Sequence, residues 1–378
     1  MNKIKILIIF GTRPEIIKLI PVIKEIQKNK NKYNLHLCTT GQHSVLKNNI
    51  IKFFNLKVDT NFNLMKNNQS LSDLNSIMIK KINDLISAYK PDYGIVHGDT
   101  STTFCSSLVF FYNKIKFFHV EAGLRTFDLF SPFPEEFNRQ ITSKLAYKHF
   151  APTRENKVNL IKENIKANSI IVTGNTSIDT IKLVMENIEK SKTIKNNIIN
   201  YLQKNLKVNF LKDQIILVTI HRRENFGNPL KEIFKSLKYL ALKHKNIKFI
   251  YPVHPNPNVS LLANKNLNGF KNIILSKPLD YHIFIFLLNI SYLVISDSGG
   301  IQEEAPFLGK PVILLRNKTE RPEVKKTGNT LIAGSNFNKI IKLVNKLIFN
   351  DNFYKKSSKT SNIYGNGDAS KIIIKNLK

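Results

Sequence analysis

Short apolar runs rich in Ile, Val and Phe recur along this 378-residue chain, separated by amphipathic stretches of helix length. Such runs are typical of strands covered on both faces, so they predict parallel sheets with alternating helices. The first series of expected strands is Ile4–Phe10, Asn34–Thr39, Tyr93–His97, Lys116–Val120, Lys148–Ala151 and Ser169–Val172. The second series is Gln214–Ile220, Ile247–Tyr251, Asn272–Leu275, Tyr292–Ser296 and Pro311–Leu315. We therefore predict an α/β protein that uses one architecture twice.

The segment Thr176–Leu211 is helical in pattern and rich in Lys and Asn, and we interpret it as a helix plus a connector. It predicts a first domain of residues 1–173 and a second domain of residues 174–360. A terminal helix is expected at Ala369–Leu377, and the segment 361–378 is expected to complete the first domain.

The net charge of +31 would ordinarily indicate a polyanionic partner. Here the excess is almost all Lys spread along the chain, without an arginine-rich arm or zinc-finger spacing, so no dedicated nucleic-acid partner is predicted. Cys38 and Cys105 are far apart and outside any CxxC motif, which favours free thiols in a reducing compartment. The longest apolar region, Ile283–Ile295, is too short to span a bilayer. These features predict a soluble, cytoplasmic protein without a membrane partner.

Lysine is absent from residues 117–143, 213–230 and 278–309, although the chain is otherwise lysine-rich. These segments contain Gly- and Pro-punctuated polar clusters, and arginines lie in the first two. Arginine presents a planar fork to carboxylate or phosphate, whereas lysine is a flexible point charge. The gaps therefore mark segments in which side-chain geometry matters.

Polar clusters come directly after the predicted strands. They are Gly11-Thr12-Arg13-Pro14, Thr40-Gly41-Gln42-His43, His97-Gly98-Asp99-Thr100, Glu121-Ala122-Gly123, His221-Arg222-Arg223-Glu224, His254-Pro255-Asn256-Pro257 and Ser296-Asp297-Ser298-Gly299-Gly300. In open α/β sheets, ligands bind outside the carboxyl ends of the strands. We therefore expect two sheets that face a central cleft lined by these clusters.

One cluster, Ser298-Gly299-Gly300, precedes a predicted helix at Ile301–Leu308 and could bind phosphate through backbone N–H groups. The alternative is a simple turn before the helix. Glu304 lies one turn into that helix, where a carboxylate can accept two ribose hydroxyls. Arg321 and Arg13 could each grip an anion, so together these residues suggest a nucleoside diphosphate.

The carboxylates Asp99, Glu121, Glu135 and Glu136 belong to loops of the first half. Two of them could remove and return a proton if their surroundings separate their pKa values. The alternative for Asp99 is a helix N-cap, and for Glu135 and Glu136 it is the first turn of a helix. His221 could donate a proton or contact phosphate, or be purely structural.

No cofactor is predicted, because the first strand lacks G-x-G-x-x-G and the chain has no P-loop. No metal is predicted either. His119 and Glu121 are suitably spaced for one face of a strand end, but no H-E-x-x-H or comparable ligand set accompanies them.

The chain resembles the non-hydrolysing UDP-N-acetylglucosamine 2-epimerases through motifs that run in order from about residue 5 to 334. They are FGTRPEIIKLIPVI, TGQH, HGDTSTTF, HVEAGLRTFDLFSPFPEEFNRQ, GNTSID, TIHRRENFG, YPVHPNPNV, PLDYHIF, SDSGGIQEEAPFLGKPVILLR and TERPE. The resemblance implies two Rossmann-like domains of the glycosyltransferase-B type, a homodimer, and reversible conversion of UDP-GlcNAc to UDP-ManNAc. Elimination of UDP would leave a 2-acetamidoglucal, and re-addition of UDP would complete the inversion at C2. The product would supply ManNAc units for cell-surface polysaccharide.

The same resemblance implies roles for individual residues. The catalytic residues would be Asp99, Glu121, Glu135 and His221. Substrate would be held by Arg13, Lys18, Arg139, Phe284, Ser298, Gly299, Gly300, Glu304 and Arg321. A second UDP-GlcNAc would act as an activator at Gln42, His43, Glu136, Arg222 and His254. The chain departs from the family pattern at Val45 and at Asn68-Gln69, where an Arg-Gln pair is frequent.

Several alternatives remain. A hydrolysing relative would release free ManNAc, but such relatives usually depart from the Gly-Thr-Arg-Pro-Glu sequence that this chain retains. A non-catalytic anion-binding protein would show no turnover and a steep salt dependence. The chain could be a 2-epimerase of a modified UDP-sugar, such as a diacetamido-uronate or a deoxy sugar. It could also be a glycosyltransferase of the same fold, which would need an acceptor as well as the nucleotide sugar.

Overall fold

The computed structural model describes residues 3–41, 45–65, 69–317, 319, 321, 323–324 and 327–377, with the backbone alone at 45–47. The chain forms two compact units. The first consists of Met1–Thr180 with Tyr364–Lys378, and the second of Ile181–Ile363.

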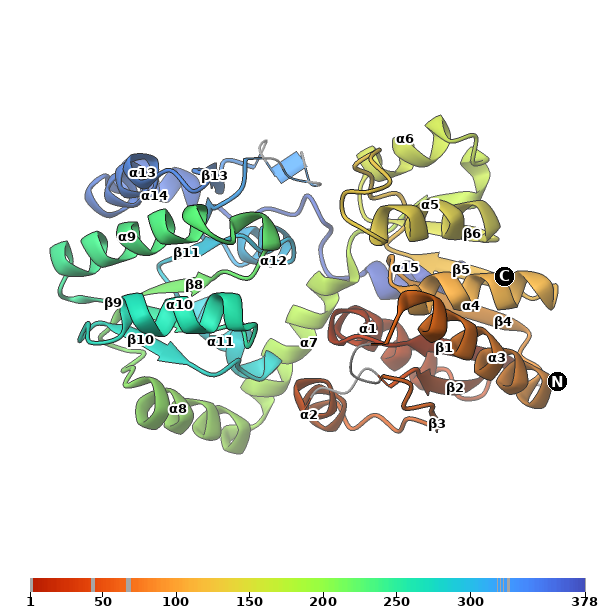
Figure 1. Cartoon of the computed structure of the whole chain (residues 1–378). Helices are drawn as coiled ribbons and strands as arrows, with labels where there is room; N and C mark the ends of the chain where they lie inside the picture. Colours follow the sequence, from red (N-terminus) through yellow and green to blue (C-terminus); the bar gives the residue numbers. More distant parts are fainter. Residues whose placement is uncertain are drawn as a thin grey trace. The chain divides into compact units, whose positions relative to one another are not determined.

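The first unit contains a seven-stranded sheet with the order β3-β2-β1-β4-β5-β6-β7, in which every neighbouring pair is parallel (Figure 1). The strands are β1 (Ile4–Phe10), β2 (Tyr33–Thr39), β3 (Thr60–Asn61), β4 (Tyr93–His97), β5 (Lys116–Val120), β6 (Lys148–Ala151) and β7 (Ile170–Val172). Its helices are α1 (Arg13–Lys28), α2 (Val45–Phe53), α3 (Leu71–Tyr89), α4 (Ser101–Tyr112), α5 (Glu135–Leu145), α6 (Arg154–Lys162), the start of α7 (Thr176–Lys190), and α15 (Ala369–Lys375), with a 3₁₀ turn η1 at Ala167–Ser169.

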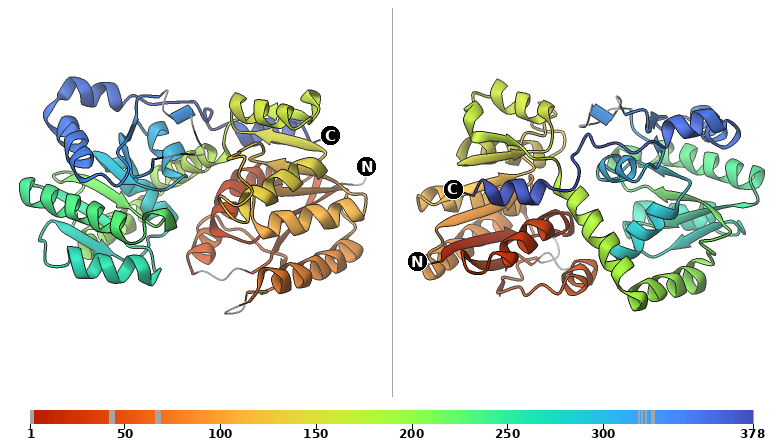
Figure 2. Two further views of the ribbon diagram at one scale, coloured as in Figure 1. Left: turned by 45° about the horizontal axis from the view of Figure 1, so that its top comes forward. Right: turned by 180° about the vertical axis from the view of Figure 1, so that it is seen from behind.

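The helices cover both faces of this sheet, with α3 and α4 on one face and α1 and α15 on the other (Figures 1 and 2). Strand β1 is buried on both sides from Ile6 to Phe10, as the unbroken apolar run of these residues predicts. Leu7 and Ile9 pack with Met78 and Ile82 of α3 and with Val109 of α4. Burial of each such side chain contributes roughly 1.5–3 kcal/mol, so this layer holds the carboxyl end of β1 in place.

The second unit contains a six-stranded parallel sheet with the order β10-β9-β8-β11-β12-β13 (Figure 1). The strands are β8 (Gln214–Thr219), β9 (Ile247–Pro252), β10 (Ile273–Ser276), β11 (Leu293–Ser296), β12 (Val312–Leu314) and β13 (Thr330–Ile332). The helices are the rest of α7, α8 (Lys192–Leu206), α9 (Asn228–Lys243), α10 (Pro257–Leu267), α11 (Tyr281–Ile290), α12 (Ile301–Phe307), α13 (Phe337–Phe349) and α14 (Asp351–Ser357), with a 3₁₀ turn η2 at Arg223–Asn225.

The predicted strands are present, with ends that differ by one residue at most, and the α/β class is confirmed. The short edge strands β3 and β13 were not predicted. The segment Thr176–Leu211 forms two helices rather than one helix and a connector, because Ser191 caps a new helix by accepting a hydrogen bond from Ile194 N at 3.3 Å.

The C-terminal residues return to the first unit, where α15 packs against α1. The carboxylate of Asp179 accepts hydrogen bonds from Ala369 N (3.2 Å), Ser370 N (2.8 Å) and Ser370 Oγ (2.6 Å). Asn175 N donates to Tyr364 O at 2.7 Å. Gly174, with a φ of +86°, lies so close that an added Cβ would come within 2.8 Å of Tyr364 O. These contacts fix the beginning of α7 to the end of the chain.

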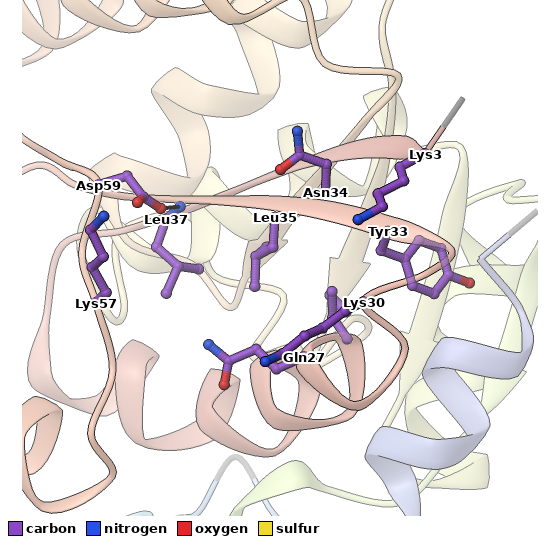
Figure 3. Close-up of a pocket in the computed structure, with 10 residues that line it drawn as sticks. Lys3, Gln27, Lys30, Tyr33, Asn34, Leu35, Leu37, Lys57 and Asp59 are labelled. Atoms are coloured by element: carbon purple, nitrogen blue, oxygen red, sulfur yellow. Dashed lines mark hydrogen bonds between the residues drawn. The ribbon is translucent and has the colours of Figure 1, made fainter. Parts of the chain in front are cut away.

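A hollow of about 410 Å³ lies beside the first residues of β2, between the end of α1 and the segment around Asp59 (Figure 3). Gln27, Lys30 and Lys57 are among the residues that line it. None of the predicted site residues that the structure describes lines this hollow, which lies at the amino end of the strand. Within the described residues, no helix combines the length and the apolar character needed to cross a bilayer.

Candidate active site

In each sheet the strand order reverses at one point. In the first unit this point lies between β1 and β4, and in the second unit between β8 and β11 (Figure 1). Crevices for ligands form at such points, outside the carboxyl ends of the two strands. In the first unit, Arg13 follows β1 and Asp99 follows β4. In the second unit, His221 follows β8 and Ser298 follows β11. Both units therefore carry predicted site residues where the topology favours binding.

The turn after β1 is built around Glu15, whose side chain is 2% exposed. Thr12 caps α1 and forms a capping box with Glu15, which accepts hydrogen bonds from Gly11 N (3.1 Å) and Thr12 N (2.6 Å). The other oxygen of Glu15 accepts from Thr100 Oγ1 at 2.8 Å and lies 3.3 Å from Thr103 Oγ1, both beyond β4. Burial raises the pKa of Glu15, and these hydrogen bonds partly offset that rise. One carboxylate thus joins the two turns that hold Arg13 and Asp99.

Asp99 is not the N-cap of α4, because Thr100 takes that position and accepts from Thr103 N at 3.2 Å. Its carboxylate instead forms a short ion pair with Arg139 of α5, and Asn138 Nδ2 donates to its carbonyl oxygen at 2.9 Å. Asp99 keeps about a quarter of its side chain exposed, at 26%. A guanidinium therefore positions this carboxylate while part of it faces solvent.

Glu135 and Glu136 form the first turn of α5, as one sequence interpretation anticipated. Glu136 is fully buried and accepts from Thr126 N (3.0 Å), Phe127 N (3.1 Å), Gln140 Nε2 (3.0 Å) and Arg139 Nη1 (3.2 Å). Burial alone would raise the pKa of Glu136, but these hydrogen bonds and the arginine outweigh it and lower the pKa. Glu136 thus anchors the loop after β5 to α5.

Glu121 directly follows β5 with a φ of +64°, a left-handed conformation that costs a non-glycine residue about 1 kcal/mol or more. Its Oε2 forms a short ion pair with Lys18 of α1 and accepts from Asn175 Nδ2 at 2.8 Å. His97 Nε2 lies 3.8 Å from the same oxygen. The strained backbone and three neighbours direct this carboxylate toward the carboxyl edge of the sheet.

In the second unit, His221 lies against the buried Asp297, with 3.4 Å between His221 Nδ1 and Asp297 Oδ1. The rings of His221 and His254 are stacked with centroids 5.7 Å apart. Burial lowers the pKa of His221. Asp297 opposes this lowering of the pKa, whereas Arg222, His254 and Arg316 add to it.

The glycine turn Ser298–Gly300 leads into α12, and Ser298 N donates to Ser296 Oγ at 2.9 Å. Glu304 of α12 is 8% exposed and accepts from Tyr281 Oη at 3.0 Å. Arg321 Nε donates to Glu303 Oε1 at 2.5 Å. Phe284 lies on α11, one turn beyond Tyr281. Glu303 and Tyr281 thus fix two of the residues expected to hold a nucleotide.

The structure brings together several of the predicted residues. In the first unit these are the pair Lys18–Glu121 and the group Asp99–Arg139–Glu136. In the second unit they are His221 and His254. Gln42 and His43 lie outside the described residues. Sequence reasoning did not single out the supporting residues Glu15, Asn175, Tyr281, Asp297 and Glu303. The T-R-P-E capping box was the one local signal that could have indicated Glu15.

Groups of three or more His, Cys, Asp or Glu side chains that could hold a metal ion do not occur among the residues that the structure describes. The side chains at the strand ends are suited to two kinds of chemistry. Asp99, Glu121 or Glu135 could transfer a proton, and arginine, histidine and backbone N–H groups could stabilise an anion.

The sheet order and the polar residues at both reversal points place the chain among two-domain Rossmann-like α/β proteins of the glycosyltransferase-B type. The sequence pattern of the family described as UDP-N-acetylglucosamine 2-epimerase matches residues 24–378. The UDP-N-acetylglucosamine 2-epimerase of Neisseria meningitidis serogroup A is 44% identical over 376 residues, which cover 99% of each protein. That of Campylobacter jejuni is 44% identical over 370 residues, 98% of this chain and 96% of the relative.

A crystal structure of the Neisseria meningitidis enzyme bound to UDP-GlcNAc has a TM-score of 0.93 to this chain, at 44% identity and 99% coverage of both. The Methanocaldococcus jannaschii enzyme in complex with UDP-GlcNAc and UDP has a TM-score of 0.82 at 32% identity, again with 99% of both chains covered. The chain belongs to the UDP-N-acetylglucosamine 2-epimerase family, which confirms the resemblance in its sequence motifs.

Proposed function

We propose that this chain is an isomerase that interconverts UDP-GlcNAc and UDP-ManNAc by inverting C2 of the sugar. The observation that carries this proposal is the agreement, over 99% of both chains, with an epimerase whose crystal structure contains UDP-GlcNAc. The carboxylates that the first unit places at the ends of β4 and β5 support it independently, because inversion at C2 requires proton transfer.

The C2–H of the sugar is too weakly acidic for direct removal of the proton. The reaction proposed here breaks the C1–O bond, so that UDP leaves with the bonding electrons while a carboxylate takes the C2 proton and a C1=C2 double bond forms. Return of a proton to the opposite face of C2, with the UDP oxygen adding again to C1, yields the epimer. Atoms and charge balance without a redox cofactor.

Two carboxylates of the first unit have different partners, which suits this chemistry. Glu121 is held by the ammonium of Lys18 and the amide of Asn175, whereas Asp99 is held by the guanidinium of Arg139. Glu135 is the third candidate, in the first turn of α5. We propose that the acid and the base of the reaction come from these three side chains, with Arg13, Lys18 and Arg139 offsetting the negative charge of the substrate.

We assign the binding of UDP mainly to the second unit. The backbone N–H groups of Ser298, Gly299 and Gly300 would bind phosphate oxygens, and Arg321 and His221 would stabilise the charge that develops on the departing UDP. Glu304, already oriented by Tyr281, would accept hydrogen bonds from the ribose, and Phe284 would contact the nucleotide.

The test is incubation with UDP-GlcNAc in deuterated water, followed by NMR. Epimerisation predicts UDP-ManNAc and deuterium at C2 with UDP still attached. Release of free sugar would indicate hydrolysis instead, and the absence of deuterium at C2 would refute the proposal. Replacing Glu121 with Gln should lower kcat by about 100-fold or more. Asp92→Asn is the control, because Asp92 is exposed and binds Lys5 N at 2.7 Å at the other end of β4.

The same assay distinguishes the proposed function from an epimerase of a modified UDP-sugar and from a glycosyltransferase. A modified UDP-sugar epimerase would leave UDP-GlcNAc unchanged and exchange the C2 proton of its own substrate. A glycosyltransferase would require an acceptor and would release UDP in a single direction.

We also propose that a second UDP-GlcNAc activates the enzyme through Arg222 and His254, with Gln42 and His43 as further candidates, and that the buried Glu136 contributes only through the loop that it anchors. The position of His254 against His221 supports this, because an activator that contacts His254 would lie beside a proposed catalytic side chain. UDP-ManNAc alone should react slowly until a trace of UDP-GlcNAc is added. Equal rates with and without the trace would refute activation.

We further propose a homodimer in the cytoplasm. Exposed aromatic side chains in the first unit support an interface there: Phe111 (56% exposed) and Tyr112 (66%) at the end of α4, and Phe130 (80%) and Phe133 (61%) before α5. Light scattering should give twice the chain mass, and a monomer mass would refute the dimer. The buried free thiols Cys38 and Cys105 are compatible with a reducing compartment.

A further inference from the structure

The carboxylate of Asp297 is completely buried at the end of β11 and is surrounded by donors from the neighbouring strand end. It accepts hydrogen bonds from His221 N (3.0 and 3.1 Å to the two oxygens), Arg222 N (2.9 Å) and Asn225 Nδ2 (2.9 Å). A buried charge is costly unless hydrogen bonds satisfy it. These donors satisfy the buried carboxylate beneath the loop that begins at His221.

The same carboxylate also reaches the imidazole ring of His221, where Oδ1 lies 3.4 Å from Nδ1. This distance is long for a hydrogen bond, but it gives strong attraction between a buried carboxylate and an N–H on that nitrogen. Among the residues that the structure describes, Arg222, Arg316 and His254 also act on the ring, and all three oppose a positive charge on it. Asp297 is the group acting on His221 whose charge favours a proton there.

We propose that Asp297 is a positioning residue that keeps a proton on Nδ1 of His221 and so presents Nε2 as the atom that acts on the substrate. The inference rests on the proposed function for the identity of that substrate, a nucleoside diphosphate sugar. A neutral imidazole carries its proton on one nitrogen only, and the partner of that nitrogen determines which one. With the Nδ1 proton held by Asp297, Nε2 of the neutral ring carries only a lone pair, whereas Nε2 of the doubly protonated ring can donate to a departing phosphate oxygen.

The alternative is that Asp297 only caps the turn at residues 221–225. Both interpretations predict that loss of the carboxylate destabilises the second unit, so stability does not distinguish them. The tautomer and the pKa of His221 do, because a purely structural cap has no reason to control either.

The experiment is a pH titration of the full-length, ¹⁵N-histidine-labelled protein without substrate, followed through the imidazole nitrogens by NMR. The signals of His221 are identified by their absence in His221→Asn. The wild-type ring should be the Nδ1–H tautomer when neutral. In Asp297→Asn, the pKa of His221 should fall by roughly one to three units and the tautomer should shift toward Nε2–H. Asp179→Asn is the matched control, because it removes another buried carboxylate in the other unit and should leave His221 unchanged.

An Nε2–H tautomer in the wild-type protein would overturn the inference without any variant, so the test survives even if Asp297→Asn fails to fold. An unchanged pKa of His221 in a folded Asp297→Asn would overturn it as well. In assays with UDP-GlcNAc, Asp297→Asn should lower kcat by one factor and raise KM by another. The factor for kcat should be at least ten times the factor for KM. Absence of epimerisation by the wild type would refute the proposed function, yet the NMR result would stand by itself.

Discussion

Replacing Glu15 with alanine should lower the free energy of unfolding of the first unit by about 3 kcal/mol. Glu15 is buried and accepts hydrogen bonds from Gly11 N, Thr12 N and Thr100 Oγ1, whereas Thr103 Oγ1, whose proton goes to His97 O, lies 3.3 Å away. The change removes the acceptor from two turns at once, so its effect should exceed that of an ordinary surface substitution.

The magnitude follows from which donors can find another acceptor. Thr103 Oγ1 already donates to His97 O at 2.5 Å, and Thr100 Oγ1 lies 3.3 Å from Thr103 Oγ1, so the hydroxyls lose little. The two backbone N–H groups of the turn lose a charged acceptor, at roughly 1.5–3 kcal/mol each. Against this, the mutation relieves the cost of burying the carboxylate, which is evident in its raised pKa. The net loss of about 3 kcal/mol is the difference between these effects.

Urea unfolding followed by far-UV circular dichroism measures this change, since the chain has no tryptophan. If the two units unfold in separate transitions, only one transition should move. Glu15→Gln should lose much less, because its amide oxygen can still serve the backbone N–H groups. Glu25→Ala is the control on the same helix: Glu25 pairs with the exposed Lys28 at 2.6 Å, a contact that should contribute less than about 0.5 kcal/mol. A Glu15→Ala effect no larger than that of Glu25→Ala would refute the reasoning.

Three further outcomes are expected. Burial raises the pKa of Cys38 and of Cys105 to about 12, so neither thiol should react with iodoacetamide at pH 8 until the protein is unfolded, and rapid labelling of the native protein would contradict this. Burial lowers the pKa of His119 to about 3, so its NMR signals should remain those of a neutral ring at pH 5. At that pH the unfolded state binds more protons than the folded state. His119 should therefore reduce the free energy of unfolding as the pH falls below about 6.5. Asp179→Ala should cost about 2–3 kcal/mol and expose α15 to proteolysis by leaving Ser370 without its acceptor, and a protease-resistant C-terminus would count against it.

The sequence was sufficient for the long strands and for the location of the polar clusters, for a physical reason. Strand β1 is apolar from Ile6 to Phe10 because helices cover both of its faces there, and this leaves a continuous signal that ends at Gly11. The two-residue strand β3 and the three-residue β13 left no such signal, because edge strands this short do not need an apolar run. The break between α7 and α8 depends on the single N-cap Ser191 within a helical pattern.

The sequence identified residues of the candidate site that follow strands, but it did not identify the buried residues that hold them in place. Glu121 and Asp99 were identified by their positions after strands, whereas the buried Asp297 and Glu15 were not assigned any role. Their importance comes from hydrogen bonds between segments 76 and 85 residues apart, which a local pattern cannot reveal. Glu136 differs, because its partners Thr126 and Phe127 are only 10 and 9 residues away; it was expected at an activator site and is also the buried anchor of the loop after β5.

The return of α15 to the first unit has a consequence for biosynthesis. The ribosome makes residues 1–180 first, yet Asp179 meets its partners only when Ala369 and Ser370 emerge, after the whole second unit has been translated. The earlier half of the polypeptide is thus the later one to mature, and a nascent chain that stalls near its end would hold a finished second unit beside an unfinished first.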